Sequence, residues 1–218
     1  MKKFGLIFDM DGVIVNNHLF HYKSWQKVCE KYGKPLSETA YKDNLNGRTL
    51  NEVVQFIFDE DLPLERIRSI GEEKEATYRE LYRPHLKFTE GLEAFLAQCK
   101  EANIPMAVGT SAPVENVDFT LDGLNIRHLF HAVLDERAVT KGKPNPEIYL
   151  KCAAALDLPN SECIVFEDAV SGIKAGKAAG SKVIALATSH AREELESDWI
   201  IDDFTKIDLQ QIEAFLSN

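Results

Sequence analysis

Short apolar runs alternate with amphipathic segments along most of the chain, and this alternation constrains the fold more than any other feature. Runs of the size of buried strands cover residues 4–8, 104–109, 132–134, 163–166, 182–186 and 198–201. Helical patterns cover residues 91–102, 114–124, 146–156, 169–179 and 207–216. Continuously apolar strands that are separated by helices are typical of a parallel sheet covered on both faces. The sequence therefore predicts an α/β fold.

Residues 16–87 interrupt this alternation, because they contain no convincing strand. Apolar residues recur there at helical spacing, as at Tyr22, Trp25 and Cys29. A chain of 218 residues is long enough for one large domain with a smaller one inserted into it. We therefore expect a catalytic core of residues 1–15 and 88–218, and an all-helical cap domain of residues 16–87.

Charge and cysteine usage narrow the class of protein. The formal net charge of −10 argues against nucleic acid and anionic membrane surfaces as partners, because both need clustered Lys and Arg. A small phosphorylated molecule remains compatible, since local positive charge or a metal can hold it. The four cysteines are scattered, and no apolar run reaches 18 residues. Both features favour a cytoplasmic protein with reduced thiols.

Two aspartates, Asp9 and Asp11, follow the first apolar run, and Gly12 then allows a tight turn. Ligands of a parallel α/β sheet bind beyond the carboxyl ends of its strands. Alternate residues of an extended chain point the same way, so the two carboxylates are expected to lie close together. Neighbouring like charges repel unless a cation lies between them. The pair indicates a metal site or two carboxylates with different tasks; the alternative is a solvated strand end.

Further polar residues follow the later strands. Thr110–Ser111 follows the second, Glu167–Asp168 follows the run at 163–166, and Lys143 precedes a predicted helix. Taken singly, each has an ordinary interpretation, as a helix cap or a surface lysine. Their occurrence at successive strand ends favours one common site. Gly172 and Gly176, in the helix that follows, are expected to allow close packing against the sheet.

With these motifs, the chain resembles the haloacid dehalogenase superfamily, in its branch of aspartate-nucleophile phosphatases and mutases. The matching motifs are Asp9-Met-Asp11-Gly12, Thr110 after an apolar strand, Lys143 in Gly-Lys-Pro-Asn-Pro, and Phe166-Glu-Asp168. The resemblance covers nearly the whole chain. It implies a Rossmann-like parallel sheet covered by helices, with an inserted helical cap.

The resemblance also implies catalytic roles. Asp9 would attack the phosphorus and form an aspartyl phosphate. Asp11 would protonate the leaving oxygen and then deprotonate water. Thr110 would bind phosphoryl oxygens, and Lys143 would neutralise negative charge. Relatives that cleave carbon–halogen or carbon–phosphorus bonds lack the second aspartate, so Asp11 argues for phosphate esters.

A metal ion is the cofactor that the resemblance implies. Mg²⁺ would be held by Asp9, the carbonyl of Asp11 and Asp168, with Glu167 completing the acidic set. Such an oxygen-rich, partly hydrated set suits Mg²⁺. It would also relieve the repulsion between the neighbouring carboxylates.

The predicted cap resembles that of β-phosphoglucomutases and of the sugar-phosphate phosphatases that share it. That likeness implies substrate binding by His21, Arg48 and Lys74, and by Ser111 in the core. The chain departs from the mutases at Leu50, where they carry an arginine, and at the hinge pair Asn16–Asn17. Both departures favour transfer of the phosphoryl group to water.

We therefore expect a monomeric, Mg²⁺-dependent phosphatase of small phosphorylated metabolites, with sugar phosphates as its substrates. Two alternatives remain open. A β-phosphoglucomutase-like isomerase would return the phosphoryl group to a sugar. A non-catalytic binding protein would keep the fold but have eroded motifs, and none of the motifs above is eroded.

Overall fold

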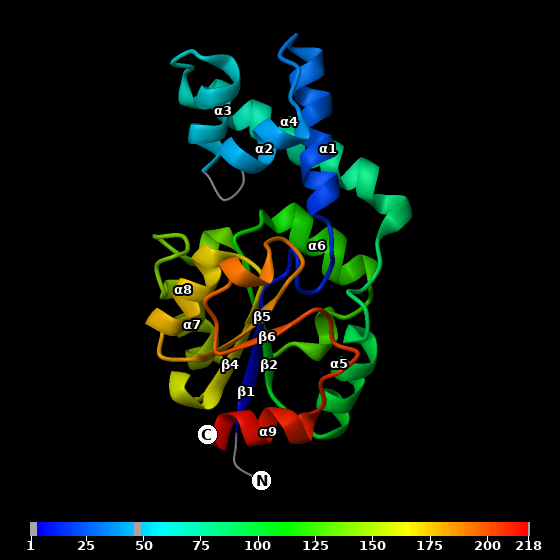
Figure 1. Ribbon diagram of the computed structural model, residues 1–218, viewed down its shortest axis with the longest axis vertical. Helices are drawn as coiled ribbons and strands as arrows, with labels where there is room; N and C mark the ends of the chain where they lie inside the picture. Colours follow the sequence, from blue (N-terminus) through cyan, green and yellow to red (C-terminus); the bar gives the residue numbers. More distant parts are fainter. Residues whose placement is uncertain (1–3, 46–48, 218) are drawn as a thin grey trace. The chain divides into compact units, whose positions relative to one another are not determined.

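A computed structural model describes residues 4–45 and 49–217, and the chain divides into two compact units. The core unit comprises Met1–Asn16 and Leu86–Asn218, and the cap unit comprises Asn17–His85 (Figure 1). Among the described residues, no helix is both long enough and apolar enough to cross a lipid bilayer.

The core unit is built on a six-stranded sheet in the order β3-β2-β1-β4-β5-β6, with every pair of neighbours parallel. The strands are β1 Gly5–Phe8, β2 Met106–Gly109, β3 Ala132–Leu134, β4 Cys163–Glu167, β5 Lys182–Leu186 and β6 Trp199–Ile201. The predicted parallel α/β fold is confirmed. Residues 104 and 105 lie outside β2, because Pro105 has no N–H for the strand ladder.

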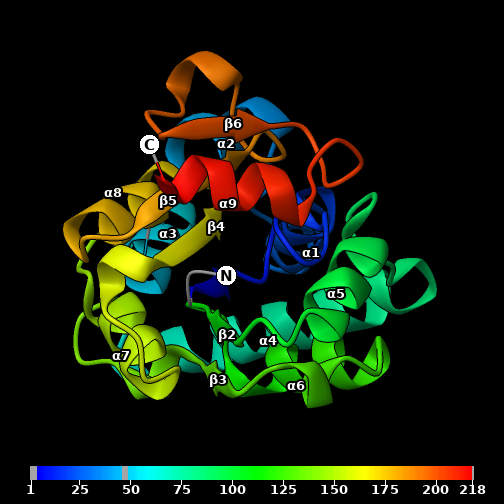
Figure 2. The ribbon, with the colours of Figure 1, turned by 90° about the horizontal axis from the view of Figure 1, so that it is seen from below.

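Helices cover both faces of this sheet. They are α5 Leu92–Glu101, α6 Val114–Gly123, α7 Glu147–Ala155, α8 Val170–Ala178 and α9 Leu209–Ser217. Figure 2 shows α7 and α8 on one side of the sheet and α5 and α6 on the other. Short 3₁₀ turns lie at Arg127–Leu129, Glu136–Ala138, Asn160–Glu162 and Arg192–Glu194.

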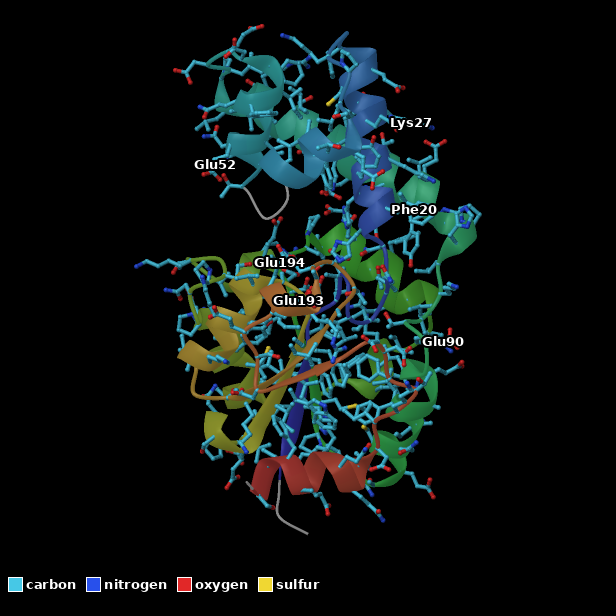
Figure 3. The ribbon with its side chains drawn as sticks, viewed as in Figure 1. Phe20, Lys27, Glu52, Glu90, Glu193 and Glu194 are labelled. Carbon is cyan, nitrogen blue, oxygen red and sulfur yellow. The ribbon has the colours of Figure 1, made fainter. Side chains whose placement is uncertain are left out.

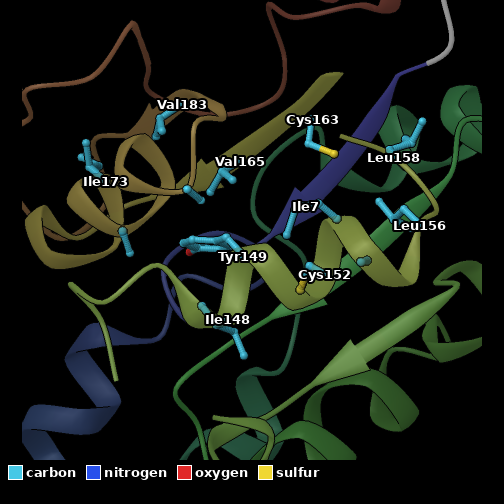
Figure 4. Close-up of a cluster of buried hydrophobic side chains, with 14 of the residues drawn as sticks. Ile7, Ile148, Tyr149, Cys152, Leu156, Leu158, Cys163, Val165, Ile173 and Val183 are labelled. Atoms are coloured by element: carbon cyan, nitrogen blue, oxygen red, sulfur yellow. The ribbon is translucent and has the colours of Figure 1, made fainter. Parts of the chain in front are cut away.

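The central strand β1 is buried along its whole length, because it has neighbours on both edges and helices on both faces. Successive side chains point to opposite faces. Ile7 belongs to the cluster under α7 and α8, which Figure 4 shows around Tyr149 and Cys152. Phe8 stacks on Phe166 of β4 instead, with ring centroids 4.9 Å apart. The continuous apolar pattern thus reflects burial of both faces.

The cap unit is helical. Its elements are α1 His18–Lys31, α2 Glu38–Asn44, α3 Leu50–Phe58, α4 Leu64–Tyr82 and a 3₁₀ turn Arg83–His85. Trp25, Val54 and Ile70 join α1, α3 and α4 in one apolar cluster. A capping box begins α3: Glu52, labelled in Figure 3, accepts the N–H of Thr49, whose hydroxyl accepts the N–H of Glu52.

Sequence reasoning missed α2, which is short and mostly polar. The Ser37 hydroxyl accepts the N–H of Ala40 and begins this helix, so its local signal is a cap rather than an apolar stripe. Side-chain caps also shift predicted boundaries. The last helix begins at Leu209 rather than at residue 207, because Asp208 and Gln211 exchange side-chain-to-backbone hydrogen bonds.

Candidate active site

The strand register brings the predicted strand-end residues together. Phe8 at the end of β1 pairs with Val108 of β2 and with Phe166 of β4. Asp9 therefore lies between the chain segments that follow β2 and β4. The chain crosses from one half of the sheet to the other between β3 and β4, so β1 and β4 flank the topological switch point. Open α/β sheets bind ligands there, outside the carboxyl ends of the strands.

Lys143 connects two of the strand ends. Its Nζ donates to Asp9 Oδ1 and to Glu167 Oε1, both at 2.7 Å, and its side chain is only 8% exposed. Burial lowers the pKa of this lysine, but the charges of Asp9 and Glu167 outweigh burial and raise it above its ordinary value. The ammonium group therefore stays charged beside Asp9.

Three buried carboxylates gather around this ammonium group. Asp9, Glu167 and Asp168 each offer an oxygen that lies within 4.8 Å of the others. Burial raises the pKa of Asp9 well above its ordinary value; the charge of Lys143 opposes this, and those of Glu167 and Asp168 add to it. A single ammonium cannot balance three ionised carboxylates. This hard, oxygen-only set fits a divalent cation such as Mg²⁺.

Glu167 is anchored on both oxygens. Its Oε1 accepts from Lys143 and from the hydroxyl of Tyr149, each at 2.7 Å. Its Oε2 accepts the backbone N–H groups of Asp168 at 2.9 Å and Ala169 at 3.0 Å. Each oxygen therefore accepts two hydrogen bonds, and these four bonds satisfy the carboxylate without water. Glu167 fixes the position of Lys143 and the turn that presents Asp168.

Gly172 makes room for this carboxylate. A Cβ atom added at Gly172 would lie 1.7 Å from Glu167 Oε1, so no other residue fits while Glu167 keeps its place. Gly176 packs against the sheet as predicted, since its added Cβ would meet Val165 and Val183. Gly172 instead serves the carboxylate cluster, a role that sequence reasoning did not identify.

The loops after β1 and β2 supply the remaining predicted core residues. Thr110 is buried, and its Oγ1 accepts the N–H of Ala112 at 3.1 Å. Ser111 beside it is exposed. Asp11 is half-buried in the loop after β1, where Gly12 has a φ of +78° and donates its N–H to the carbonyl of Val15. The tight turn expected at Gly12 is therefore present.

Two hydroxyls that follow β5 hold these loops, and sequence reasoning missed them. Thr188 Oγ1 donates to the carbonyl of Gly12, and Ser189 Oγ donates to the carbonyl of Asp168, both at 2.7 Å. They follow the predicted strand at 182–186, much as Thr110 follows the predicted strand at 104–109, so the same search for polar residues after strands could have found them. Tyr149 gave no such signal, because it occupies an apolar position of α7.

The predicted cap residues are only partly described. In the cap unit, Lys74 Nζ lies 2.8 Å from His21 Nδ1, so the structure brings these two residues together. The His21 ring also stacks on Tyr78, with centroids 4.1 Å apart. Arg48 lies outside the described residues.

Comparisons with known proteins identify the family of this chain. The family model of haloacid dehalogenase-like hydrolases matches residues 6–186. A fructose-1-phosphate phosphatase of Escherichia coli is 33% identical over 83% of this chain and 94% of its own. A β-phosphoglucomutase of Bacillus subtilis is 28% identical over 94% of this chain and 92% of its own. The crystal structure of a family IA hydrolase from Entamoeba histolytica superimposes with a TM-score of 0.91 at 29% identity, covering 98% of this chain and 99% of that one. The chain belongs to the haloacid dehalogenase-like hydrolase family.

Proposed function

We propose that this protein is a Mg²⁺-dependent phosphatase of small phosphorylated metabolites, with sugar phosphates as substrates. The observation that carries the proposal is the shared ammonium group of Lys143, which binds Asp9 and Glu167 inside a buried cluster of three carboxylates. A cluster of this kind has both a carboxylate nucleophile and the positive charge that an incoming phosphate needs. The similarity to a fructose-1-phosphate phosphatase supports the choice of substrate class.

Asp9 is the nucleophile in this proposal. It must be ionised to attack phosphorus, and burial alone works against ionisation. The hydrogen bond from Lys143 opposes that effect at the oxygen it contacts, Oδ1. The bond from Asp9 to phosphorus forms as the bond from phosphorus to the leaving oxygen breaks, and Asp11 gives that oxygen its proton. Asp11 then takes a proton from the water that hydrolyses the aspartyl phosphate.

Asp9, the carbonyl of Asp11 and Asp168 would hold the Mg²⁺, with the charge of Glu167 beside them. The ion would neutralise charge on the transferring phosphoryl group. Thr110 would donate its hydroxyl to a phosphoryl oxygen, and Ser111 would face the substrate at the exposed end of the same loop. Phosphoryl transfer depends mostly on such positioning and electrostatics.

The thiols do not compete for the role of nucleophile. All four cysteines are free and buried. Burial raises the pKa of Cys99 and Cys152 to about 12, so neither is a thiolate at neutral pH. Buried free thiols fit a reducing compartment, which supports our assignment of the protein to the cytoplasm.

Phosphate release from a panel of sugar phosphates tests the proposal. We expect Mg²⁺-dependent hydrolysis of fructose 1-phosphate or a related monophosphate, and slower hydrolysis of p-nitrophenyl phosphate. If no member of the panel, p-nitrophenyl phosphate included, releases phosphate above the buffer rate, the protein is not a phosphatase.

A β-phosphoglucomutase activity is the second candidate, on the similarity to that enzyme. It is tested with β-glucose 1-phosphate and a trace of glucose 1,6-bisphosphate, following glucose 6-phosphate and free phosphate together. We expect free phosphate to dominate, because Leu50 stands where mutases carry an arginine. Rapid formation of glucose 6-phosphate without phosphate release would make the protein a mutase.

Gly172→Ala is expected to lower the rate of phosphate release by roughly a hundredfold while the protein stays folded. The added methyl group displaces Glu167, and a shift of about 1 Å in a catalytic group can cost on the order of 10²-fold in rate. Gly176→Ala is the matched control on the same helix: its Cβ would meet the apolar side chain of Val183 at 2.8 Å, so we expect a lower Tm and a nearly unchanged kcat. Equal kcat values for the two variants would contradict the role of Gly172.

A further inference from the structure

The segment that follows β5 contacts both of the turns that carry the proposed metal ligands. The sheet order is β1-β4-β5, so β4 separates β5 from β1 by about two strand spacings of 4.8 Å. Even so, the Thr188 hydroxyl donates to the carbonyl of Gly12, in the loop after β1. The hydroxyl of Ser189, the next residue, donates to the carbonyl of Asp168, which directly follows β4. Two adjacent hydroxyls therefore tie together the turns that follow two other strands.

The backbone of Asp168 is held on both sides. Its N–H donates to Glu167 Oε2 at 2.9 Å, and its carbonyl accepts from Ser189 Oγ at 2.7 Å. The residue is buried in the carboxylate cluster. With both backbone groups fixed, the Cα–Cβ bond has a fixed direction, and so has the position from which the carboxylate can bind a metal. The Ser189 hydroxyl therefore acts on this carboxylate through the backbone.

Gly12 is held in the same way. Its N–H donates to the carbonyl of Val15 at 2.7 Å, and its own carbonyl accepts from Thr188 Oγ1 at 2.7 Å. Glycine has more conformational freedom than any other residue, so these bonds supply a restraint that its backbone lacks. The N–H of Gly12 shares a peptide plane with the carbonyl of Asp11, and in a trans peptide the two groups point in opposite directions. The bonds at Gly12 therefore set the direction of the Asp11 carbonyl, a proposed metal ligand.

His190 fixes the direction of the Ser189 hydroxyl. Ser189 Oγ lies 2.7 Å from His190 Nδ1. A serine hydroxyl has one hydrogen, and a carbonyl can only accept, so that hydrogen is donated to Asp168. Nδ1 of His190 must therefore carry a hydrogen and donate it to Ser189 Oγ. The two bonds form a chain from His190 through Ser189 to Asp168, in which each bond polarises the next.

The segment itself is fixed to the sheet. Ala187, which precedes the two hydroxyls, donates its N–H to the carbonyl of Ile201 in β6 at 2.9 Å. The three residues that follow, 188–190, are all half-buried. Groups that hold a functional site in its productive geometry must themselves be held by their surroundings. The two hydroxyls meet this condition, because the segment that carries them is bonded to an edge strand.

On the proposed Mg²⁺-dependent function, we propose that Thr188, Ser189 and His190 are positioning residues of the metal site. They hold Asp168 and the carbonyl of Asp11 in the directions from which both would bind Mg²⁺, and they act without binding the ion themselves. Replacing a residue that orients the ligands of a metal typically lowers metal affinity by roughly 10–100-fold. The affinity for Mg²⁺ then depends on two hydroxyls that lie outside the carboxylate cluster.

Calorimetric titration of the metal-free protein with magnesium chloride tests this role without turnover. Ser189→Ala is expected to raise the Kd for Mg²⁺ by about tenfold or more. Ser197→Ala is the matched control, because Ser197 is also half-buried between β5 and β6 and donates its hydroxyl to the carbonyl of Trp199 at 2.7 Å. Each variant loses one bond of the same kind, so both should lower the Tm in chelator to a similar extent. Only Ser189→Ala should weaken Mg²⁺ binding.

Two pairs of variants separate the hydrogen bonds from the shapes of the side chains. Thr188→Val keeps the shape and loses the hydroxyl, so we expect the Kd for Mg²⁺ to rise about tenfold. Thr188→Ser keeps the hydroxyl and should keep the parental Kd. His190→Ala should weaken Mg²⁺ binding, and His190→Asn should restore it, because the amide nitrogen of asparagine can donate from nearly the place of Nδ1.

The outcomes distinguish this inference from the proposed function. If the parent protein binds Mg²⁺ and Ser189→Ala and Ser197→Ala have equal Kd values, the inference is wrong and the metal site stands. Parental affinity in Thr188→Val would overturn the role of Thr188, and equal affinities of His190→Ala and His190→Asn would overturn that of His190. If the parent protein binds no Mg²⁺, the metal-dependent function and this inference both fail.

Discussion

Asp9→Asn is expected to lower phosphate release by about 10⁴–10⁶-fold, to the limit of detection. An amide is not a usable nucleophile, and loss of a covalent catalytic residue typically has an effect of this order. The substitution keeps the shape of the side chain, so Glu167 and Lys143 still contact each other across the cluster. A variant that kept more than a tenth of the parental rate would exclude Asp9 as the nucleophile.

Thermal unfolding separates this loss from a loss of structure. Because the pKa of Asp9 is raised in the folded protein, there is a pH range above the ordinary carboxyl pKa in which the folded state still holds a proton that the unfolded chain has released. The free energy of unfolding therefore falls as the pH rises through this range, and once Asp9 is ionised its buried charge destabilises the metal-free fold. Asparagine carries no charge, so in chelator the variant should unfold at the same Tm as the parent or higher. Asp157→Asn, at an exposed position, is the control and should keep the parental rate and Tm.

The fold could be predicted from the sequence because its core strands are apolar on both faces. A strand such as β4, buried throughout, leaves a continuous apolar run whose interpretation does not depend on the rest of the chain. The helix α2 leaves no such trace, since most of its residues are polar and its start depends on one serine hydroxyl. Helix boundaries were misplaced by a residue or two for the same reason: caps such as Asp208 are local and short.

The residues of the candidate site that directly follow parallel strands could be predicted from the sequence. Asp9 and Glu167 follow paired residues on neighbouring strands, so their proximity is a consequence of sheet geometry. Tyr149 and Gly172 could not be found in this way. Each matters because of where the Glu167 side chain lies, and that position is fixed by tertiary contacts.

Removing divalent metal is expected to reduce phosphate release by roughly 10²–10³-fold, and added Mg²⁺ should restore it. A bound metal is worth several kcal/mol of transition-state stabilisation, and about 1.4 kcal/mol corresponds to a factor of ten in rate. The rate is measured in excess chelator, after dialysis, and again with Mg²⁺ in excess. Equal rates with and without metal would show that Lys143 alone supplies the positive charge.

A binding measurement keeps this prediction independent of turnover. Three buried carboxylates around one ammonium group repel one another, so Mg²⁺ should stabilise the folded protein. At a hundredfold excess over Kd, the expected rise in Tm is roughly 5–10 °C for a protein of this size. Asp168→Asn removes a carboxylate from the cluster and should abolish most of that rise, whereas Asp157→Asn should keep it. If the two variants respond equally to Mg²⁺, the ion binds elsewhere, and the buried carboxylates then serve only to orient Lys143.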